Sequence, residues 1–364
     1  MKESFRRSRI SIAIAGLLVA IFTASAFAAG ARSTSENIFV VHNLVSDQAG
    51  VADRVDPNLV NAWGLTSLPT SPWWVADNET DVSTLYRADG TIVPLVVEVP
   101  NGPTGDAANT GTNFVIHEGT ASAAARFLFD TEEGKILGWN PAVSSSHAVV
   151  AVDRSNVGAI YKGLAIELSP TGTADFLYAA DFHNARVDVF DGSFGLVTAP
   201  GAFVDPKLPS GYAPFGIANI DGQIFVAYAK QDAEQSDEIA GQGLGVVDRF
   251  TTTGAFLGRV ATHGQLNAPW GLARAPASFG PFGGDLLVGN FGDGEINAYE
   301  PQADGTYERV GALRDENHQP ILIDGLWALA FGKGAPSNGP IDTLFFTAGP
   351  DEEEHGLFGT IRAK

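Results

Sequence analysis

The sequence predicts an all-β protein, and within that class a six-bladed β-propeller. Three observations lead to this prediction: a Gly-Leu pattern recurs about every fifty residues, a β-rich apolar run follows each copy, and Asp-Gly pairs separate later runs. Helical periodicity is not convincing outside the first 28 residues. Four short strands in each of six units are the arrangement of a propeller.

The Gly-Leu pattern marks the start of each predicted innermost strand. Its copies are WGLT (63–66), KGLA (162–165), FGIA (215–218), WGLA (270–273) and DGLW (324–327). Their glycines are separated by 99, 53, 55 and 54 residues, so the first gap holds two units. We expect the missing copy at GTNFVIH (111–117), with Asn113 in place of glycine. Innermost strands crowd around the propeller axis, and glycine lets neighbouring strands approach.

A second strand is predicted after each copy of the pattern. The six runs are WWVAD (73–77), RFLFD (126–130), FLYAAD (176–181), IFVAYA (224–229), LLVGN (286–290) and LFFTA (344–348). A polar loop and a third run follow in every unit. Asp-Gly pairs, at 89–90 and 191–192 for example, predict hairpin turns because these residues adopt positive φ readily.

The two ends of the repeat region predict how the ring closes. The sixth unit ends after its third run, GLFGTIRAK (356–364), one strand short of four. An unassigned apolar run, NIFVVHNLV (37–45), precedes the first unit. We expect this run to be the outer strand of the last blade, because that pairing covers two exposed edges. Residues 37–364 would then be a single domain.

The first 28 residues have the pattern of a secretory signal peptide. Basic residues precede a short apolar core (10–22), and Ala26-Phe27-Ala28 is a small-x-small cleavage site. We expect residues 1–28 to be removed and residues 29–36 to be a short linker. The mature chain would be secreted or periplasmic, with no membrane insertion after cleavage.

Composition limits the partners and the chemistry. The chain has 42 acidic and 22 basic residues, a formal net charge of −20, so nucleic acid and anionic membranes would repel it. It has no cysteine, which excludes disulfides and cysteine-ligated metals. The expected partner is a protein, a glycan or a small-molecule ligand, and the expected state is a monomer.

One stretch carries a family resemblance. AADFHNARVDVFDG (179–192) resembles the core of the NHL repeat, and the chain from residue 37 onward is similar to a family of secreted bacterial β-propeller proteins. The resemblance implies the fold and export, and it implies no activity. Asp181 and Asn184 would then be turn formers whose side chains bond their own backbone. The turn does not require His183.

Candidate binding residues lie in loops that a propeller gathers on one face. These are the loops between second and third strands and the long loops between blades. The candidate ligand-binding residues are Asn61, Trp63, His183, Trp270, Asp324 and Trp327. The tryptophans either stack a ring at the channel mouth or belong to the core between blades.

Every loop between a second and a third strand also carries carboxylates. Asp77, Asp181 and Asp293 are candidate ligands of a divalent cation such as calcium, which prefers oxygen ligands. If His183 participates, a transition metal fits better. The alternative interpretation of these acids is a solvated acidic surface.

Two functions from different classes follow. The first is an exported binding or scaffold propeller that recognises a partner or small ligand on its loop-rich face. The second is a metal-dependent hydrolase or lyase, similar to the propeller lactonases, with its site at the central channel mouth. In those lactonases the first inner strand begins with a metal-binding glutamate. Asn61 lies at that position here, which favours the first function.

Overall fold

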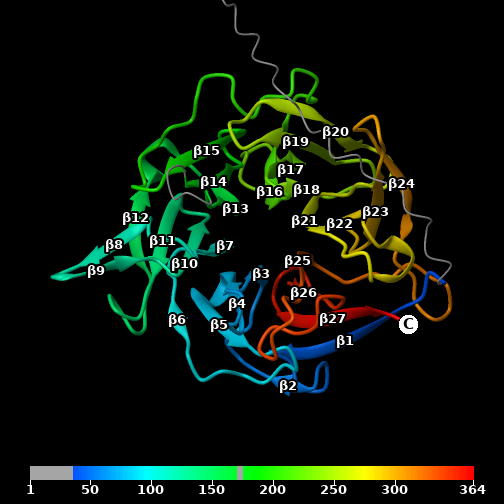
Figure 1. The fold of residues 1–364 in the computed structure, drawn as a ribbon, viewed down its shortest axis with the longest axis horizontal. Coiled ribbons are helices and arrows are strands. Elements are labelled where there is room, and N and C mark those ends of the chain that lie inside the picture. The colour runs from blue at the N-terminus through cyan, green and yellow to red at the C-terminus, as the bar shows by residue number, and fades with distance from the viewer. Residues whose placement is uncertain (1–35, 170–174) are drawn as a thin grey trace, which may run out of the picture. The chain divides into compact units, whose positions relative to one another are not determined.

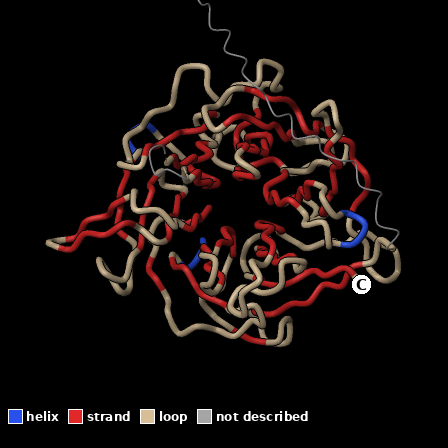
Figure 2. Tube along the Cα trace, in the orientation of Figure 1, coloured by secondary structure: helices blue, strands red, loops and turns tan. Residues whose placement is uncertain are grey.

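The computed structural model describes residues 36–169 and 175–364. The predicted signal peptide (1–28) and residues 29–35 of the predicted linker lie outside the described residues. The described chain is nearly all β and forms six blades around a central axis (Figures 1 and 2), which confirms the predicted fold class. Within these residues, no helix is long and apolar enough to cross a membrane.

The blades follow the chain, and each sheet runs outward from an inner strand. Blade one contains β3 (Ala62–Thr66), β4 (Trp73–Asp77), β5 (Val82–Tyr86) and β6 (Val97–Glu98). Blade two contains β7 (Pro103–Ala108), β10 (Phe127–Thr131), β11 (Lys135–Trp139) and β12 (Val149–Asp153). Among the described residues, blade three contains three strands: β13 (Tyr161–Glu167), β14 (Phe176–Asp181) and β15 (Arg186–Asp191).

The second half of the ring has the same plan. Blade four contains β16 (Tyr212–Ile220), β17 (Gln223–Gln231), β19 (Val246–Thr251) and β20 (Phe256–Thr262), with β18 (Glu238–Ile239) paired to β17. Blade five contains β21 (Pro269–Arg274), β22 (Leu286–Asn290), β23 (Ile296–Pro301) and β24 (Tyr307–Ala312). Blade six contains β25 (Leu326–Phe331), β26 (Leu344–Ala348) and β27 (Leu357–Ala363), followed outward by β1 (Phe39–Ser46) and β2 (Arg54–Val55).

The remaining elements are small. The hairpin of β8 (Val115–Glu118) and β9 (Ala121–Ala124) projects from the ring beside blade two (Figure 1). Three short 3₁₀ turns lie in loops: η1 (Asn78–Thr80), η2 (Ser155–Val157) and η3 (Gly280–Phe282).

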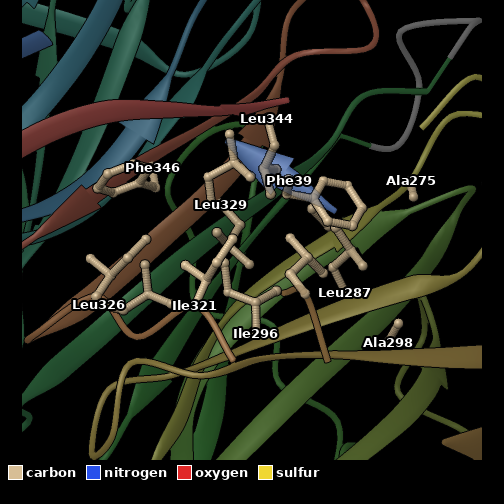
Figure 3. Close-up of a cluster of buried hydrophobic side chains, with 14 of the residues drawn as sticks. Phe39, Ala275, Leu287, Ile296, Ala298, Ile321, Leu326, Leu329, Leu344 and Phe346 are labelled. Atoms are coloured by element: carbon tan, nitrogen blue, oxygen red, sulfur yellow. The ribbon is translucent and has the colours of Figure 1, made fainter. Parts of the chain in front are cut away.

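The N-terminal strand closes the ring as predicted. β1 pairs antiparallel with β27 from Phe39 opposite Ala363 to Ser46 opposite Leu357. Phe39 is 1% exposed and packs among side chains of blades five and six (Figure 3). Its ring lies 4.9 Å from that of Phe279. The last blade therefore takes both its outer ladder and part of its core from the other end of the described chain.

The structure confirms why glycine recurs near the start of the inner strands. A Cβ on Gly216 would lie 2.1 Å from the carbonyl oxygen of Trp270, and one on Gly271 would lie 2.5 Å from that of Trp327. Neighbouring inner strands thus approach each other at the glycine itself.

Two of the predicted repeat positions are wrong. The inner strand of blade two is β7, with Gly105 at the glycine position, whereas much of 111–117 leads into and forms β8. In blade six the ladder register places Ala328, not Gly325, at that position. Gly325 precedes the strand and has a positive φ of 60°. The Gly-Leu pattern did not identify β7, because Gly105 is followed by Asp106 rather than by an aliphatic residue.

Candidate functional site: a central channel divided by an aromatic layer

Six equivalent residues of the inner strands, one before each glycine position, meet at the axis. They are Trp63, Thr104, Lys162, Phe215, Trp270 and Trp327. The rings of Trp63 and Trp327 stack with centroids 3.5 Å apart, and Phe215 and Trp270 meet both tryptophans edge-on. We call the four rings of Trp63, Phe215, Trp270 and Trp327 the aromatic layer. Trp63, Phe215 and Trp327 belong to one buried cluster, against which Trp270 packs.

The aromatic layer separates two ends of the channel. On the upper face, which carries the loops between second and third strands, Phe291 stacks on Trp327 at 4.1 Å and Phe182 packs on Phe215. Trp63 and Trp327 are at most 2% exposed, so they are core residues. Trp270 is partly exposed and lines a cavity on the lower face, where the inner strands end.

Four of the six predicted ligand-binding residues come together here: Asn61, Trp63, Trp270 and Trp327. Asn61 is fully buried, and its Oδ1 accepts a hydrogen bond from Trp327 Nε1 at 3.0 Å. Its Nδ2 donates to Glu353 Oε2 at 2.6 Å. Asn61 thus links the aromatic layer to the upper mouth.

The other two predicted ligand-binding residues lie in outer loops of the upper face. His183 is partly exposed, and its Nδ1 is 3.3 Å from the carbonyl oxygen of Gln235. Asp324 accepts a hydrogen bond from the backbone amide of Asp351 at 2.9 Å, which fixes the loop after β26. Neither takes part in the aromatic layer.

The three carboxylates predicted as metal ligands are held separately, each within its own blade. Asp77 accepts from the Thr84 amide at 2.9 Å, and Asp293 accepts from Asn290 and Asn267. Asp181 accepts from the amide and side chain of Asn184, as expected for a turn former. No cluster of three or more histidine, aspartate or glutamate side chains suited to a metal occurs in 36–169 and 175–364.

The upper mouth instead holds a buried lysine among acids. Lys162 Nζ donates to Glu132 Oε1 at 2.5 Å and to Asp237 Oδ1 at 2.9 Å. Its side chain is only 2% exposed, and its ammonium lies 5.3 Å from the Trp63 ring centroid, within the range of a cation–π contact. Lys162 and the carboxylates that surround it, Glu132, Asp237, Glu238 and Glu353, are together called the Lys162 cluster.

The electrostatics of the Lys162 cluster are those of an ammonium surrounded by excess negative charge. Burial lowers the pKa of Lys162, but Glu132, Glu238 and Asp237 outweigh this and raise the pKa overall. Burial raises the pKa of Glu238 to about 8, against the opposing effect of Lys162. The lysine therefore stays charged at neutral pH and neutralises part of the acidic mouth.

One departure from the repeat marks this lysine in the sequence. The copy KGLA has a lysine where the other well-formed copies have tryptophan or phenylalanine. A charged residue at a position that is otherwise aromatic and axial indicates a specific charge partner.

Below the aromatic layer lies a cavity of about 390 Å³. The residue after each glycine position faces it, and five of the six are aliphatic: Leu65, Leu164, Ile217, Leu272 and Leu329. The sixth equivalent residue is Asp106. Trp270 also contributes to the wall, and Lys333 lies at the mouth. We call this cavity the lower chamber.

Asp106 is the unusual residue of the lower chamber. It is 9% exposed, and neither carboxylate oxygen has a hydrogen-bond partner of good geometry. Burial raises its pKa well above the usual range, Asp130 raises it further, and Lys333 and nearby backbone amides offset part of the shift. A buried carboxyl without a firm partner is costly, so its retention requires an explanation.

Asp130 lies behind β7 and has a different role. Its Oδ1 accepts hydrogen bonds from Thr104 Oγ1 at 2.8 Å and from the Gly105 amide at 2.6 Å. These bonds hold the bulge at which β7 turns Thr104 and Asp106 toward the axis. Burial raises the pKa of Asp130 to about 7, although those bonds work against the shift.

Two viral proteins are similar to this chain over most of its length. Uncharacterized protein R648 of Acanthamoeba polyphaga mimivirus is 33% identical over 334 residues, which cover 88% of this chain and 79% of that protein. Uncharacterized protein L690 of the same virus is 32% identical over 335 residues, which cover 88% and 85%. The chain belongs to the family of these mimivirus proteins. The bacterial origin implied by the sequence resemblance stays a prediction.

Solved structures agree on the fold. A glucose dehydrogenase aligns with a TM-score of 0.54 at 13% identity, covering 89% of this chain and 99% of that one. A structural genomics protein of unknown function from Bacteroides thetaiotaomicron aligns with a TM-score of 0.53 at 11% identity, covering 90% and 73%. No family model matches the chain. At this identity the likeness concerns the propeller fold, and the site is argued from its own residues.

Proposed function

We propose that this protein is a binding propeller that takes a small organic molecule into the lower chamber. The observation that carries the proposal is a cavity of about 390 Å³ on the propeller axis, lined by the aliphatic ring, by Trp270 and by polar residues that include Thr66, Ser67 and Asn219. Ligand pockets commonly have a volume in this range. The proposal moves the binding site from the predicted loop-rich face to the opposite face.

The Lys162 cluster is evidence against the alternative function, a metal-dependent hydrolase or lyase with its site at the upper mouth. An ammonium already lies among the carboxylates that a divalent cation would need. The aromatic layer also closes the channel directly beneath it. The binding function therefore has the better support.

We also propose that the protein works after export, because residues 1–28 have the pattern of a signal peptide. An exported chain that begins at residue 29 is the measurable sign of this step. A chain that keeps Met1 after export would contradict it.

The binding proposal is tested by filling the lower chamber. Four probes share one phenyl body and differ in charge: L-phenylalanine, 2-phenylethylamine, 3-phenylpropionate and 2-phenylethanol. We expect calorimetry to show micromolar to millimolar binding, on the order of −4 to −8 kcal/mol, for at least one probe. Ala218→Trp should abolish that binding, because Ala218 lines the chamber and indole would occupy it.

Ala303→Trp is the matched control, because Ala303 is exposed in the turn between β23 and β24. It should bind like the parent, and both variants should melt cooperatively. Binding of every active probe to Ala218→Trp with unchanged affinity, or no binding of any probe to the parent, would contradict the proposal.

A further inference from the structure

Only one charge on the wall of the lower chamber is within reach of a ligand. Among the described residues that line it, Asp106 and Lys333 carry a charge and the others are neutral. Both carboxylate oxygens of Asp106 are closed to solvent and lie against the backbone of β3, where a Cβ on Gly64 would lie 2.9 Å from Oδ1. A ligand in the chamber therefore cannot form a hydrogen bond to Asp106.

Lys333 is the charge that a ligand can reach. It follows the end of β25, is exposed, and lies at the mouth of the chamber. Its Nζ donates a hydrogen bond to the carbonyl oxygen of Ser67, and no ion pair to it occurs within residues 36–169 and 175–364. The bond to Ser67 holds the ammonium at the mouth and leaves two of its three N–H donors for a ligand.

The surroundings of this ammonium favour an anionic partner. The chamber wall removes part of its hydration, and this desolvation lowers the pKa of Lys333, although Asp106 offsets part of the shift through space. A carboxylate from a ligand would replace the lost water with charge-assisted hydrogen bonds, which are about twice as strong as neutral ones.

A second cation lies beside the same mouth. Arg126 lines an adjoining depression of about 450 Å³, which shares Pro69 and Thr110 with the wall of the lower chamber. Arg126 is exposed, and its side chain has no ion pair within the described part of the chain. The acid Glu167 accepts a hydrogen bond from Asn219 on the side of blades three and four, across the ring from Lys333. The mouth is therefore positive on the side of blades six, one and two, in contrast to the acidic upper mouth.

These charges select one class of ligand, and this step rests on the proposed function. We propose that the lower chamber binds an organic anion with an apolar body, whose carboxylate or similar group lies at Lys333. The body would lie against the aliphatic ring and Trp270. A cationic group at the mouth would meet repulsion from Lys333, and the shielded oxygens of Asp106 could not bind it.

The four phenyl probes separate this class from the others. We expect 3-phenylpropionate to bind about fivefold more tightly than 2-phenylethanol, a moderate factor because the mouth is open to solvent. 2-Phenylethylamine should bind more weakly than the alcohol. L-Phenylalanine should bind more weakly than 3-phenylpropionate, because its ammonium finds no reachable carboxylate in the chamber.

Two variants of the lysine test its role directly. Lys333→Gln removes the charge and keeps an N–H donor, so it should weaken 3-phenylpropionate about fivefold and leave 2-phenylethanol within about twofold. Lys333→Glu should reverse the order of the acid and the amine. Lys207→Gln is the matched control, because Lys207 is exposed and does not line the chamber, and it should keep the ranking of the parent.

The reversal in Lys333→Glu is the decisive readout, because a general disturbance of the chamber would weaken all probes alike. Thermal melting of each variant shows whether the propeller is intact, and the ranking of the probes on the parent is a second test that needs no variant. If the alcohol, the amine or L-phenylalanine binds to the parent as tightly as 3-phenylpropionate, the anion inference is wrong while the binding function stands. The same holds if Lys333→Gln leaves the affinity for the acid unchanged. If none of the four probes binds, both are wrong.

Discussion

Removal of β1 is expected to unfold the whole propeller. A chain that begins after Ser46 loses the ladder along β27, and it loses the buried side chains of Phe39, Leu44 and Val45. Each buried side chain of this kind contributes about 1.5–3 kcal/mol, so the three together approach the entire stability of a typical domain, about 5–15 kcal/mol. Opening the ring also exposes the edge of β27 to pairing with other chains.

Denaturant unfolding followed by circular dichroism measures this effect. We expect the truncated chain to lack the cooperative transition of the parent, and Phe39→Ala alone to lose about 3–5 kcal/mol. A synthetic peptide of residues 36–46 should restore the transition when added in excess, because it can supply the missing strand. A truncated chain that unfolds at the parent midpoint would contradict closure by β1.

Replacing the buried lysine of the upper mouth should have the second largest effect. Lys162→Met leaves Glu132, Asp237, Glu238 and Glu353 without their common cation. Removing one partner of a fully buried ion pair costs roughly 3–5 kcal/mol. Because the side chains of Glu132 and Asp237 are 33% and 68% exposed, we expect a loss at the lower end of this range or below it. Lys207→Met is the matched control, since Lys207 is exposed, and it should unfold within about 0.5 kcal/mol of the parent.

The pH dependence of the stability lost in Lys162→Met shows whether charge explains the loss. In the parent the pKa of Lys162 is raised, so its ammonium persists across pH 5–8 and its contribution is constant there. The pKa values of Glu238 and Glu353 are raised by burial, and Lys162 opposes both shifts. Without Lys162 these two groups hold their protons more firmly when folded than when unfolded, so stability falls as pH rises. The loss should therefore be larger at pH 8 than at pH 5, and Glu132→Gln added to Lys162→Met should recover part of it. An equal loss at both values would show that packing, not charge, explains the defect.

The fold could be predicted in large part because every blade of a propeller must satisfy the same packing constraints. Glycine recurs where one inner strand meets the next, and WWVAD (73–77), FLYAAD (176–181), LLVGN (286–290) and LFFTA (344–348) coincide with β4, β14, β22 and β26. The orphan run at the N-terminus predicted β1 because the last unit lacked a strand. Local spacing carries this information, so no knowledge of tertiary contacts was needed.

The site could be predicted only in part because its charged residues lie at positions where the chain departs from the repeat. Asn61 and the axial tryptophans were found from their positions beside the repeated glycines. Lys162 stands where the other blades mostly have an aromatic residue, and Asp106 stands where they have an aliphatic one. The regular pattern therefore does not indicate either residue. The positions of the acids predict convergence on a cation, but each of Asp77, Asp181 and Asp293 forms hydrogen bonds within its own blade. Such short-range bonds depend on loop conformation, which spacing does not determine.

The most direct test of the central claim is a crystal structure with 3-(4-bromophenyl)propionate, phased on the bromine signal. We expect one anomalous peak inside the lower chamber, within the ring of Leu65, Leu164 and their equivalents. A peak on the upper side of the aromatic layer, or an empty chamber at saturating ligand, would contradict it.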